Sequence, residues 1–391
     1  MPESEEKPLV VIRSLVYNHE PYLRDCLEGF VMQQTTFPFV AVVHDDCSTD
    51  GSAAILREYA EKYPHIIKPV YETENQYSKP GKPLRRIMDE ACGKYGAKYY
   101  ALCEGDDYWT DPHKLQKQVD FLESHPDYTM VCSDAVVRSP EGDLTEEELE
   151  RIGWPRYCKE CDIPTEDTIT KGGWLIHTAS IVYRQGLRND YPEACRNRLA
   201  GGDIQLQIFA ALKGKIHYFH EKMVVYRRGS GSASWTNTAM QKQDAGIIKS
   251  WESDLDMYES LNIYSRGKYE KEFHIGAIKC IAWHMVLNPH LMAKAMPRVG
   301  KAFLYCNLEP WYGNGNDKGI GSFLQHKFLK WCYHPYYPLP EYNFLLRPFL
   351  RLFFIIKGPR RTFHIGPIGL VSFVRQANGK DAVFVLGKRV K

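Results

Sequence analysis

Three acidic residues, Glu104, Asp106 and Asp107, follow a short apolar run in the stretch ALCEGDDYWTDP at residues 101–112. Like charges this close raise one another's pKa values unless a cation lies among them. The cluster is therefore either a solvated turn or a metal site. Mg²⁺ and Mn²⁺ take oxygen ligands, commonly one or two carboxylates completed by substrate phosphates and water. Asp106 and Asp107 are the predicted ligands of such an ion.

A second acidic pair, Asp45 and Asp46, ends another apolar run in VVHDDCSTDGS at residues 42–52. Ser48, Asp50 and Gly51 are typical of a helix start and account for the second half of this stretch. They do not account for the acidic pair itself. A carboxylate at this position can accept a hydrogen bond from a ring N–H, as an acid does when it reads the edge of a base.

The elements that must position these acids alternate between strands and helices in the first half of the chain. Strands are predicted at residues 9–15, 39–44, 66–72, 98–103 and 128–137, and helices after Pro21, near 52–63, near 83–95 and after Pro112. This order predicts an α/β fold with a mainly parallel sheet and helices on both faces. Ligands of such sheets bind beyond the carboxyl ends of the strands, where both acidic pairs are expected.

The character of the sequence changes after residue 235. Segments 238–262 and 267–287 are typical of long helices, and the chain from residue 288 onward is aromatic, basic and punctuated by proline. We therefore predict three parts: a catalytic domain at 1–235, a helical extension at 236–325 and a basic aromatic tail at 326–391.

Residues 9 to about 235 resemble the family 2 glycosyltransferases of the GT-A (Rossmann-like) fold. The resemblance is carried by VIRSLVYNHEPYLRDCLEGFVMQQT, VVHDDCSTDGSAAIL and ALCEGDDYWTDPHKLQKQVDFLE, in this order. It implies that Tyr17 borders the nucleobase of a nucleoside-diphosphate sugar and that Asp46, beside Asp45, binds the ring N–H. It also implies that Asp106 and Asp107 are the metal-binding acids, with Asp107 the direct ligand. Glu104 stands where many members have Asp, and Cys47 where Gly is usual.

Further site residues follow from the same resemblance. Asp203, after two glycines in AGGDIQLQIFAALKGK at 200–215, matches the family's catalytic base, although it could serve only as a helix N-cap. Arg227 and Arg228, in VVYRRGSGSAS at 224–234, match a segment that closes over the diphosphate. Arg85 and Arg86 occupy roughly the place of an arginine near the donor. His177 either points into the cleft or is a core histidine.

The function implied is that of an inverting glycosyltransferase that depends on Mn²⁺ or Mg²⁺. Its partners would be a nucleoside-diphosphate sugar, with UDP as the default nucleotide, and a glycan or lipid-linked acceptor in bacterial surface-polysaccharide assembly. One alternative is a non-catalytic nucleotide-sugar or carbohydrate-binding module on the same fold. Another is a sugar nucleotidyltransferase, but the chain has no glycine before Gly29 and so lacks a glycine-rich phosphate loop after its first strand.

Charge and cysteine content bear on the cellular setting. Eleven cysteines without a paired framework and an N-terminus without a signal peptide favour the cytoplasm, and Cys158 and Cys161 form a CxxC for which free thiols are favoured over zinc. Residues 327–391 hold 12 Lys and Arg against Glu341 and Asp381, a net charge of +10, which leaves −8 for the first 326 residues. The stretch 342–361 predicts a helix, broken or bent at Pro348, that lies on an anionic membrane surface. The alternative is a basic helix that packs on the catalytic domain through its aromatic side. No DNA-binding pattern accompanies the charge, so nucleic acid is not expected as a partner.

Overall fold

The computed structural model describes residues 6–77, 79, 83–151, 154, 156–171, 175–192, 195, 202–229 and 244–277, and strands between residues 354 and 389. These residues belong to two compact units. The first holds everything described up to residue 277, apart from Arg151, and the second holds the strands from residue 354 onward.

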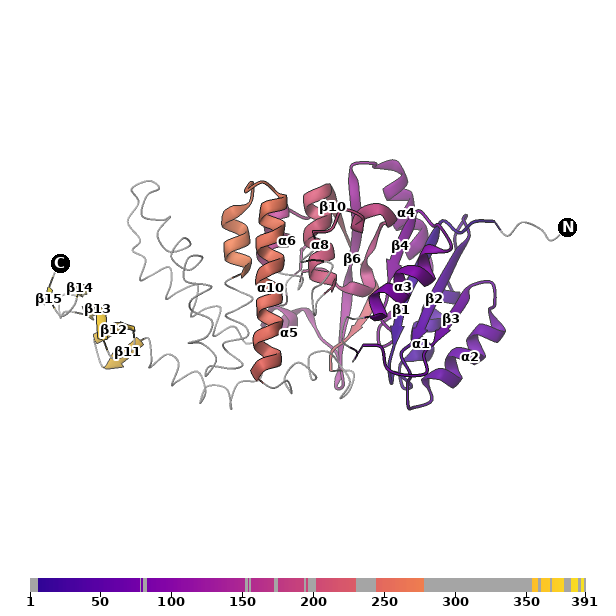
Figure 1. Ribbon diagram of the computed structural model, residues 1–391, viewed down its shortest axis with the longest axis horizontal. Helices are drawn as coiled ribbons and strands as arrows, with labels where there is room; N and C mark the ends of the chain where they lie inside the picture. The colour runs from indigo at the N-terminus through magenta and orange to yellow at the C-terminus, as the bar shows by residue number, and fades with distance from the viewer. Residues whose placement is uncertain are drawn as a thin grey trace. The chain divides into compact units, whose positions relative to one another are not determined.

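A mixed, mainly parallel sheet forms the centre of the first unit (Figure 1). Its main path runs in the order β3-β2-β1-β4-β9-β6-β10-β5. The strands β1 to β4 are parallel to one another, β9 is antiparallel to both of its neighbours, β10 is parallel to β6, and β5 is antiparallel to β10. The bounds are β1 Val10–Val16, β2 Phe39–Asp45, β3 Ile67–Tyr71, β4 Tyr99–Leu102, β5 Tyr108–Trp109, β6 Tyr128–Ser139, β9 Val182–Arg184 and β10 Lys215–Arg227, with the short strands β7 Gly142–Asp143 and β8 Cys161–Asp162 beside β6 and β10.

Helices cover both faces of this sheet, as the alternation of strands and helices predicts. One buried cluster joins the sheet to α1 (Leu23–Val31), α2 (Ser52–Lys62) and α4 (Lys114–Ser124). The other cluster joins it to α3 (Pro83–Gly93), α6 (Thr165–Lys171), α8 (Gly202–Lys213) and α10 (Asp244–Tyr264). The structure also describes α5 (Glu146–Arg151), the short 3₁₀ turns η1 (Thr178–Ser180) and η2 (Gln185–Arg188), and a helical stretch at residues 270–277.

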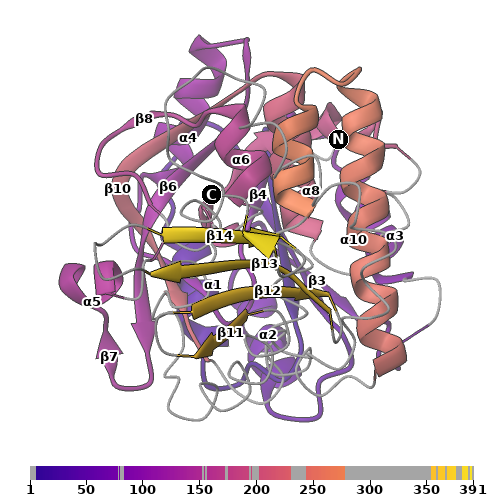
Figure 2. The same ribbon diagram turned by 90° about the vertical axis from the view of Figure 1, so that its left-hand side faces the viewer.

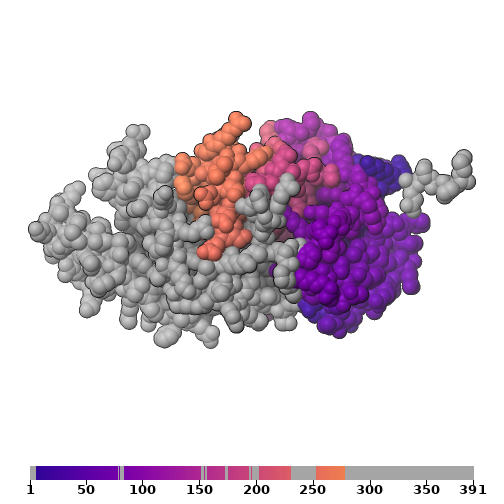
Figure 3. Space-filling model, in the orientation of Figure 1, coloured from indigo at the N-terminus to yellow at the C-terminus, as the bar shows by residue number. Residues whose placement is uncertain are grey.

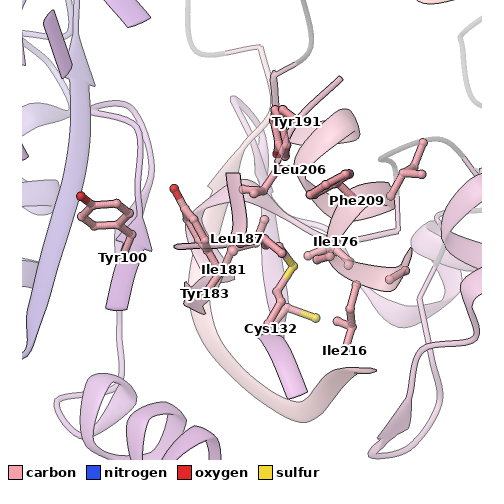
Figure 4. Packing of buried hydrophobic residues seen from close by; sticks show 14 of the residues in the cluster. Tyr100, Cys132, Ile176, Ile181, Tyr183, Leu187, Tyr191, Leu206, Phe209 and Ile216 are labelled. Carbon is pink, nitrogen blue, oxygen red and sulfur yellow. The ribbon is translucent and has the colours of Figure 1, made fainter. Parts of the chain in front are cut away.

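The side chains of β1 divide between the two clusters with the period of a strand. Val10 and Ile12 are buried in the cluster that contains α1, while Val11 is buried in the cluster that contains α8. Figure 4 shows part of the second cluster, where Cys132 of β6, Tyr183 of β9 and Phe209 of α8 lie together. The apolar run Val10–Ile12 therefore reflects a strand that is buried on both faces.

The two predicted long helices lie partly within the described residues. α10 occupies Asp244–Tyr264, and residues 270–277 are also helical. The Phe209 and Tyr264 rings, 5.0 Å apart between centroids, join α8 to α10. The orange atoms in Figure 3 belong to α10 and the residues that follow it. α10 thus packs on the unit that contains the sheet, and the boundaries near residues 235 and 325 stay predictions.

The second unit is a five-stranded antiparallel sheet in the order β11-β12-β13-β14-β15. Its strands are β11 Phe354–Lys357, β12 Arg360–Ile365, β13 Ile368–Arg375, β14 Asp381–Val385 and β15 Lys388–Arg389, of which β11 to β14 are labelled side by side in Figure 2.

The helix predicted for residues 342–361 is therefore wrong over its last part. Residues 354–357 and 360–361 are strands, and residues 342–353 lie outside the described residues. The physical reason is pairing between segments: β11 pairs antiparallel with β12, and the apolar residues Phe354, Ile355 and Ile356 are compatible with such a strand.

Candidate active site

The two acidic motifs meet beside the carboxyl end of β1. The parallel register pairs Val16 with Asp45, the last residue of β2, and the backbone N–H of Asp46 donates to the Val16 carbonyl at 2.9 Å. On the other side of β1, the N–H of Gly105 donates to the Leu15 carbonyl at 2.9 Å. Two motifs separated by about sixty residues thus lie at one edge of the sheet, where parallel sheets bind ligands.

The acidic turn carries negative charge that its surroundings compensate only in part. Burial, together with the carboxylates of Asp106 and Asp203, raises the pKa of Glu104 to about 8. Burial and then Asp106 also raise the pKa of Asp107, which is 4% exposed. The backbone N–H of Arg227 opposes this effect by donating to Asp107 Oδ1 at 2.8 Å. A cation at this turn would relieve the repulsion.

Asp203 lies in the first turn of α8 and reaches the same acidic turn, because its carboxylate interacts electrostatically with Glu104. The Thr178 hydroxyl is 3.5 Å from Asp203 Oδ2, a long hydrogen bond from η1. The turn after β4 and the first turn of α8 therefore lie near enough for the carboxylates of Asp106 and Asp203 to interact with Glu104. A partly exposed carboxylate on a first helical turn, where the helix dipole favours its charge, is suited to accept a proton.

His177 forms a cluster of three rings with Trp154 and Tyr226 beside Thr178. Its ring centroid is 5.4 Å from that of Trp154 and 5.3 Å from that of Tyr226, and the Trp154 indole N–H donates to His177 Nε2 at 3.3 Å. Burial lowers the pKa of His177 to about 4. The ring is therefore neutral at physiological pH, and its contacts match the core-histidine interpretation.

Asp46 holds a loop. Its Oδ1 accepts the backbone N–H of Gln76 at 2.7 Å, and its Oδ2 accepts that of Tyr77 at 3.0 Å. Its neighbour Asp45 is also buried, accepts the Ser48 N–H through Oδ2 at 3.3 Å, and has no hydrogen-bond partner at Oδ1 among the described residues. Tyr17 is 37% exposed and directly follows β1, so the predicted nucleobase-binding residues do share one edge of the sheet.

The predicted arginines divide into two groups. Arg227 belongs to the acidic turn: its guanidinium donates to the Asp106 carbonyl at 2.8 Å, pairs with Asp25, and lies over the rings of Tyr22 and Tyr108. The backbone N–H of the next residue, Arg228, donates to the Arg138 carbonyl.

Arg85 and Arg86, on α3, make their described contacts elsewhere. Arg85 donates to the Cys195 carbonyl at 3.0 Å, and burial followed by the nearby Arg188 lowers its pKa to about 10. Arg86 forms an exposed ion pair with Glu90 one helical turn away.

Sequence reasoning missed His19, which also lies at this edge. Burial lowers the pKa of His19, while Asp106, Asp50 and Asp45 are close enough to oppose that effect electrostatically. The sequence feature that could have identified His19 as a site residue is its position two residues after Tyr17, between the end of β1 and α1.

The donor set of the acidic turn fits a hard divalent cation. In the described part of the chain, no group of three or more His, Cys, Asp or Glu side chains is arranged to hold a metal ion. A site with two protein carboxylates, completed by substrate phosphates and water, does not require such a group. Asp106 and Asp107 supply two oxygen donors of the correct type, and the pKa of Asp107 is raised by burial and then by the Asp106 carboxylate.

Comparison with known proteins identifies the family. The family described as Glycosyl transferase family 2 matches residues 14–191. An uncharacterized protein of Mycobacterium tuberculosis is 33% identical over 298 residues, which cover 75% of this chain and 78% of the relative. The Bacillus subtilis protein TuaG, named for a teichuronic acid biosynthesis glycosyltransferase, is 34% identical over 116 residues, 30% of this chain and 42% of TuaG.

The chain was also compared with the crystal structure of Staphylococcus aureus TarS 1-349 in complex with UDP. The superposition has a TM-score of 0.46 and 15% sequence identity, and it covers 92% of this chain and 97% of the TarS chain. The mixed sheet with acidic motifs at its carboxyl edge defines a nucleotide-diphospho-sugar transferase type of fold, GT-A. The chain belongs to glycosyl transferase family 2 and is a glycosyltransferase. Within the described residues, no helix is both long and apolar enough to span a membrane.

Proposed function

We propose that this protein is an inverting glycosyltransferase that depends on Mn²⁺ or Mg²⁺. It moves a sugar from a nucleoside-diphosphate sugar, a UDP-sugar by default, to a hydroxyl of a glycan or lipid-linked acceptor. The setting is bacterial surface-polysaccharide assembly in the cytoplasm, a setting that the name of the relative TuaG supports.

One observation carries the proposal: a candidate base and a candidate cation site share one edge of the sheet. Asp203 and Asp106 come from separate elements, yet both carboxylates interact with Glu104. A binding module would need the acids that hold a nucleotide diphosphate, but it would have no use for a further carboxylate beside them. The grouping therefore favours catalysis over the non-catalytic alternative.

In the proposed reaction, Asp203 Oδ1 or Oδ2 accepts the proton of the acceptor hydroxyl as its oxygen attacks the anomeric carbon. Thr178 orients this carboxylate, and Arg227 fixes the acidic turn through Asp107 and the Asp106 carbonyl. Tyr17 borders the nucleobase, and Asp46 fixes the loop at Gln76 and Tyr77 beside it. Asp106 and Asp107 would hold the divalent ion, which when bound neutralises charge on the departing nucleoside diphosphate.

The test is a screen of sugar nucleotides with the full chain and either Mn²⁺ or Mg²⁺. We expect release of free nucleoside diphosphate from at least one donor, and a product whose anomeric configuration is inverted by NMR. Binding without release would favour the non-catalytic module. Release of pyrophosphate from a nucleoside triphosphate and a sugar phosphate would favour the nucleotidyltransferase. A retained configuration would contradict single displacement.

We also propose that the basic C-terminal region brings the enzyme to an anionic membrane surface, where a lipid-linked acceptor would be found. The net charge of +10 over residues 327–391 supports this, because each Lys or Arg near an anionic leaflet contributes about 1 kcal/mol. Sedimentation of the full chain with anionic and with neutral liposomes tests it. Equal recovery in both supernatants would exclude the surface as a partner.

A further inference from the structure

His19 is packed between the two acidic motifs, although no motif assigns it a role. Its backbone N–H donates to the Ser52 hydroxyl at 2.9 Å, which fixes it to the start of α2. Its ring lies directly over Gly105 of the acidic turn, because a Cβ at Gly105 would be only 2.8 Å from His19 Nδ1. The side chain thus bridges the segment after β1 and the turn that holds Asp106 and Asp107.

The surroundings of His19 Nδ1 determine where the ring carries its proton. Nδ1 is buried and has no hydrogen-bond partner among the described residues. A proton on Nδ1 would bury an unsatisfied N–H against Gly105, which costs more free energy than burying a lone pair there. The neutral ring therefore carries its proton on Nε2, which makes Nε2 a hydrogen-bond donor.

The charges around the ring indicate what this donor serves. The carboxylates of Asp45, Asp50 and Asp106 are near enough to interact with it. Asp45 belongs to the proposed nucleobase side and Asp106 to the proposed diphosphate side. The part of a nucleotide that lies between base and diphosphate is the ribose and its first phosphate, and both present oxygens that accept hydrogen bonds.

We infer that His19 is a donor-nucleotide-binding residue whose Nε2–H donates to a ribose or phosphate oxygen of the bound nucleoside diphosphate. This inference rests on the proposed function. It assigns two separate tasks to one side chain: the Nδ1 edge packs on Gly105, and the Nε2 edge binds the ligand.

Two substitutions separate these tasks. His19→Gln places an amide N–H near the position of Nε2, and His19→Asn places it near Nδ1, while both remain polar and smaller than the original ring. Binding of UDP and of GDP, each with Mn²⁺, is measured by isothermal titration calorimetry for the full-length wild type and both variants. We expect His19→Asn to weaken binding by about tenfold to a hundredfold, the effect of one hydrogen bond to a charged group. His19→Gln should stay within a few fold of the wild type.

The outcomes distinguish this inference from the proposed function. If the wild type binds neither nucleotide, both the proposed function and the inferred role of His19 are contradicted. If the wild type binds and both variants bind equally well, or lose affinity equally, only the role of Nε2 is overturned. Should a variant fail to fold, ¹⁵N NMR of the wild-type imidazoles decides: the His19 Nε2 resonance should shift on saturation with the nucleotide, and an unchanged resonance would contradict the inference.

Discussion

At the scale of single residues, the site combines acids that repel one another with groups that hold them in place. Glu104, which is partly buried, and Asp107, which is buried, follow the end of one strand, and their pKa values are raised by desolvation and by Asp106. Arg227 offsets part of this repulsion through its backbone N–H on Asp107. The site is therefore held in a charge state that a cationic ligand would stabilise.

Asp107→Asn should leave the fold intact and remove activity. The Asn side-chain oxygen can still accept the Arg227 N–H, and the change removes a buried charge, so the melting temperature should not fall. Sugar transfer should drop by about 10²-fold or more, the scale of losing one strong electrostatic stabiliser. Steady-state kinetics and thermal denaturation measure both, with the exposed Asp120→Asn on α4 as the control. Near-normal turnover of Asp107→Asn in the presence of a chelator would show that the metal site is elsewhere.

Asp203→Asn should retain nucleotide binding but lose transfer by about 10²- to 10⁴-fold, the range of general-base catalysis. The amide keeps the shape of the side chain and its contact with Thr178, but it cannot accept the proton. Calorimetry with UDP or GDP and single-turnover kinetics separate the two effects. Asp190→Asn, which removes the exposed ion pair with Lys213, is the matched control. A parallel loss of donor affinity and turnover would point to a binding role for Asp203.

Sequence reasoning identified the residue types of this site better than their contacts. Asp106 and Asp107 follow a strand, β4, and Asp203 lies in the first turn of a helix, α8, as predicted, because strand ends and helix starts can be inferred from local patterns. Asp46 and Arg227 differ, since their partners are backbone groups of Gln76, Tyr77 and Asp106. Every residue except proline carries the same backbone donor and acceptor, so the sequence gives no sign of which one a side chain will meet.

At the scale of elements, the close approach of α1 to β5 places the acidic turn. Gly29 on α1 faces the backbone of Trp109: a Cβ there would be 2.9 Å from the Trp109 nitrogen and 3.1 Å from its oxygen. Trp109 directly follows the acidic turn and Tyr108, and its indole N–H donates to the Ala179 carbonyl at 2.8 Å. A helix with a side chain at this position would push β5 away from the sheet.

Gly29→Ala should therefore destabilise the protein by about 1–3 kcal/mol, the usual effect of overpacking, although alanine is the better helix former. Gly93→Ala, at the end of α3, is the matched control, because a Cβ there meets nothing within 4 Å. Chemical denaturation of both variants gives the free energies of unfolding. Equal stability of the two variants would contradict the tight α1–β5 contact.

Strands and helices of the first half could be predicted because their apolar residues follow a clear period and their ends carry turn residues. The C-terminal prediction was wrong for a physical reason: a mixed apolar and basic run fits an interfacial helix and a strand pair equally well by composition. What decides between them at residues 354–361 is pairing with β12 and β13, a contact between segments that single-segment patterns do not report.

At the scale of the whole molecule, one buried cation makes stability depend on pH. Lys114, at the start of α4, is fully buried, donates to Gln118 at 2.7 Å and lies over the Trp109 ring. Burial lowers the pKa of Lys114 to about 7, although Cys103, Asp111 and Cys132 oppose the effect. In the unfolded chain a lysine has a pKa of about 10.4.

The direction in which the contribution of Lys114 to stability changes with pH follows from the number of protons that the folded and unfolded states bind. Between pH 7 and about 10.4 the unfolded state binds more protons at this residue, so its contribution to the free energy of unfolding rises with pH. Below pH 7 both states are protonated, and the full cost of burying the charge is present. Lys114→Met should therefore raise the free energy of unfolding at pH 6, by up to about 4 kcal/mol before the lost Gln118 and Trp109 contacts are subtracted. The gain should shrink toward pH 10.

Lys117→Met on the same helix provides a control, because the contribution of Lys117 to stability should change with pH in the opposite direction. Lys117 is partly exposed, and its hydrogen bonds to Glu221 and Asp111 raise its pKa, so its stabilising contribution is present below about pH 10 and disappears above it. Denaturation curves of the wild type and both variants at pH 6, 8 and 10 give the differences, in which the titration of all other groups cancels. A Lys114→Met difference that does not change with pH would mean that Lys114 stays charged in the folded protein.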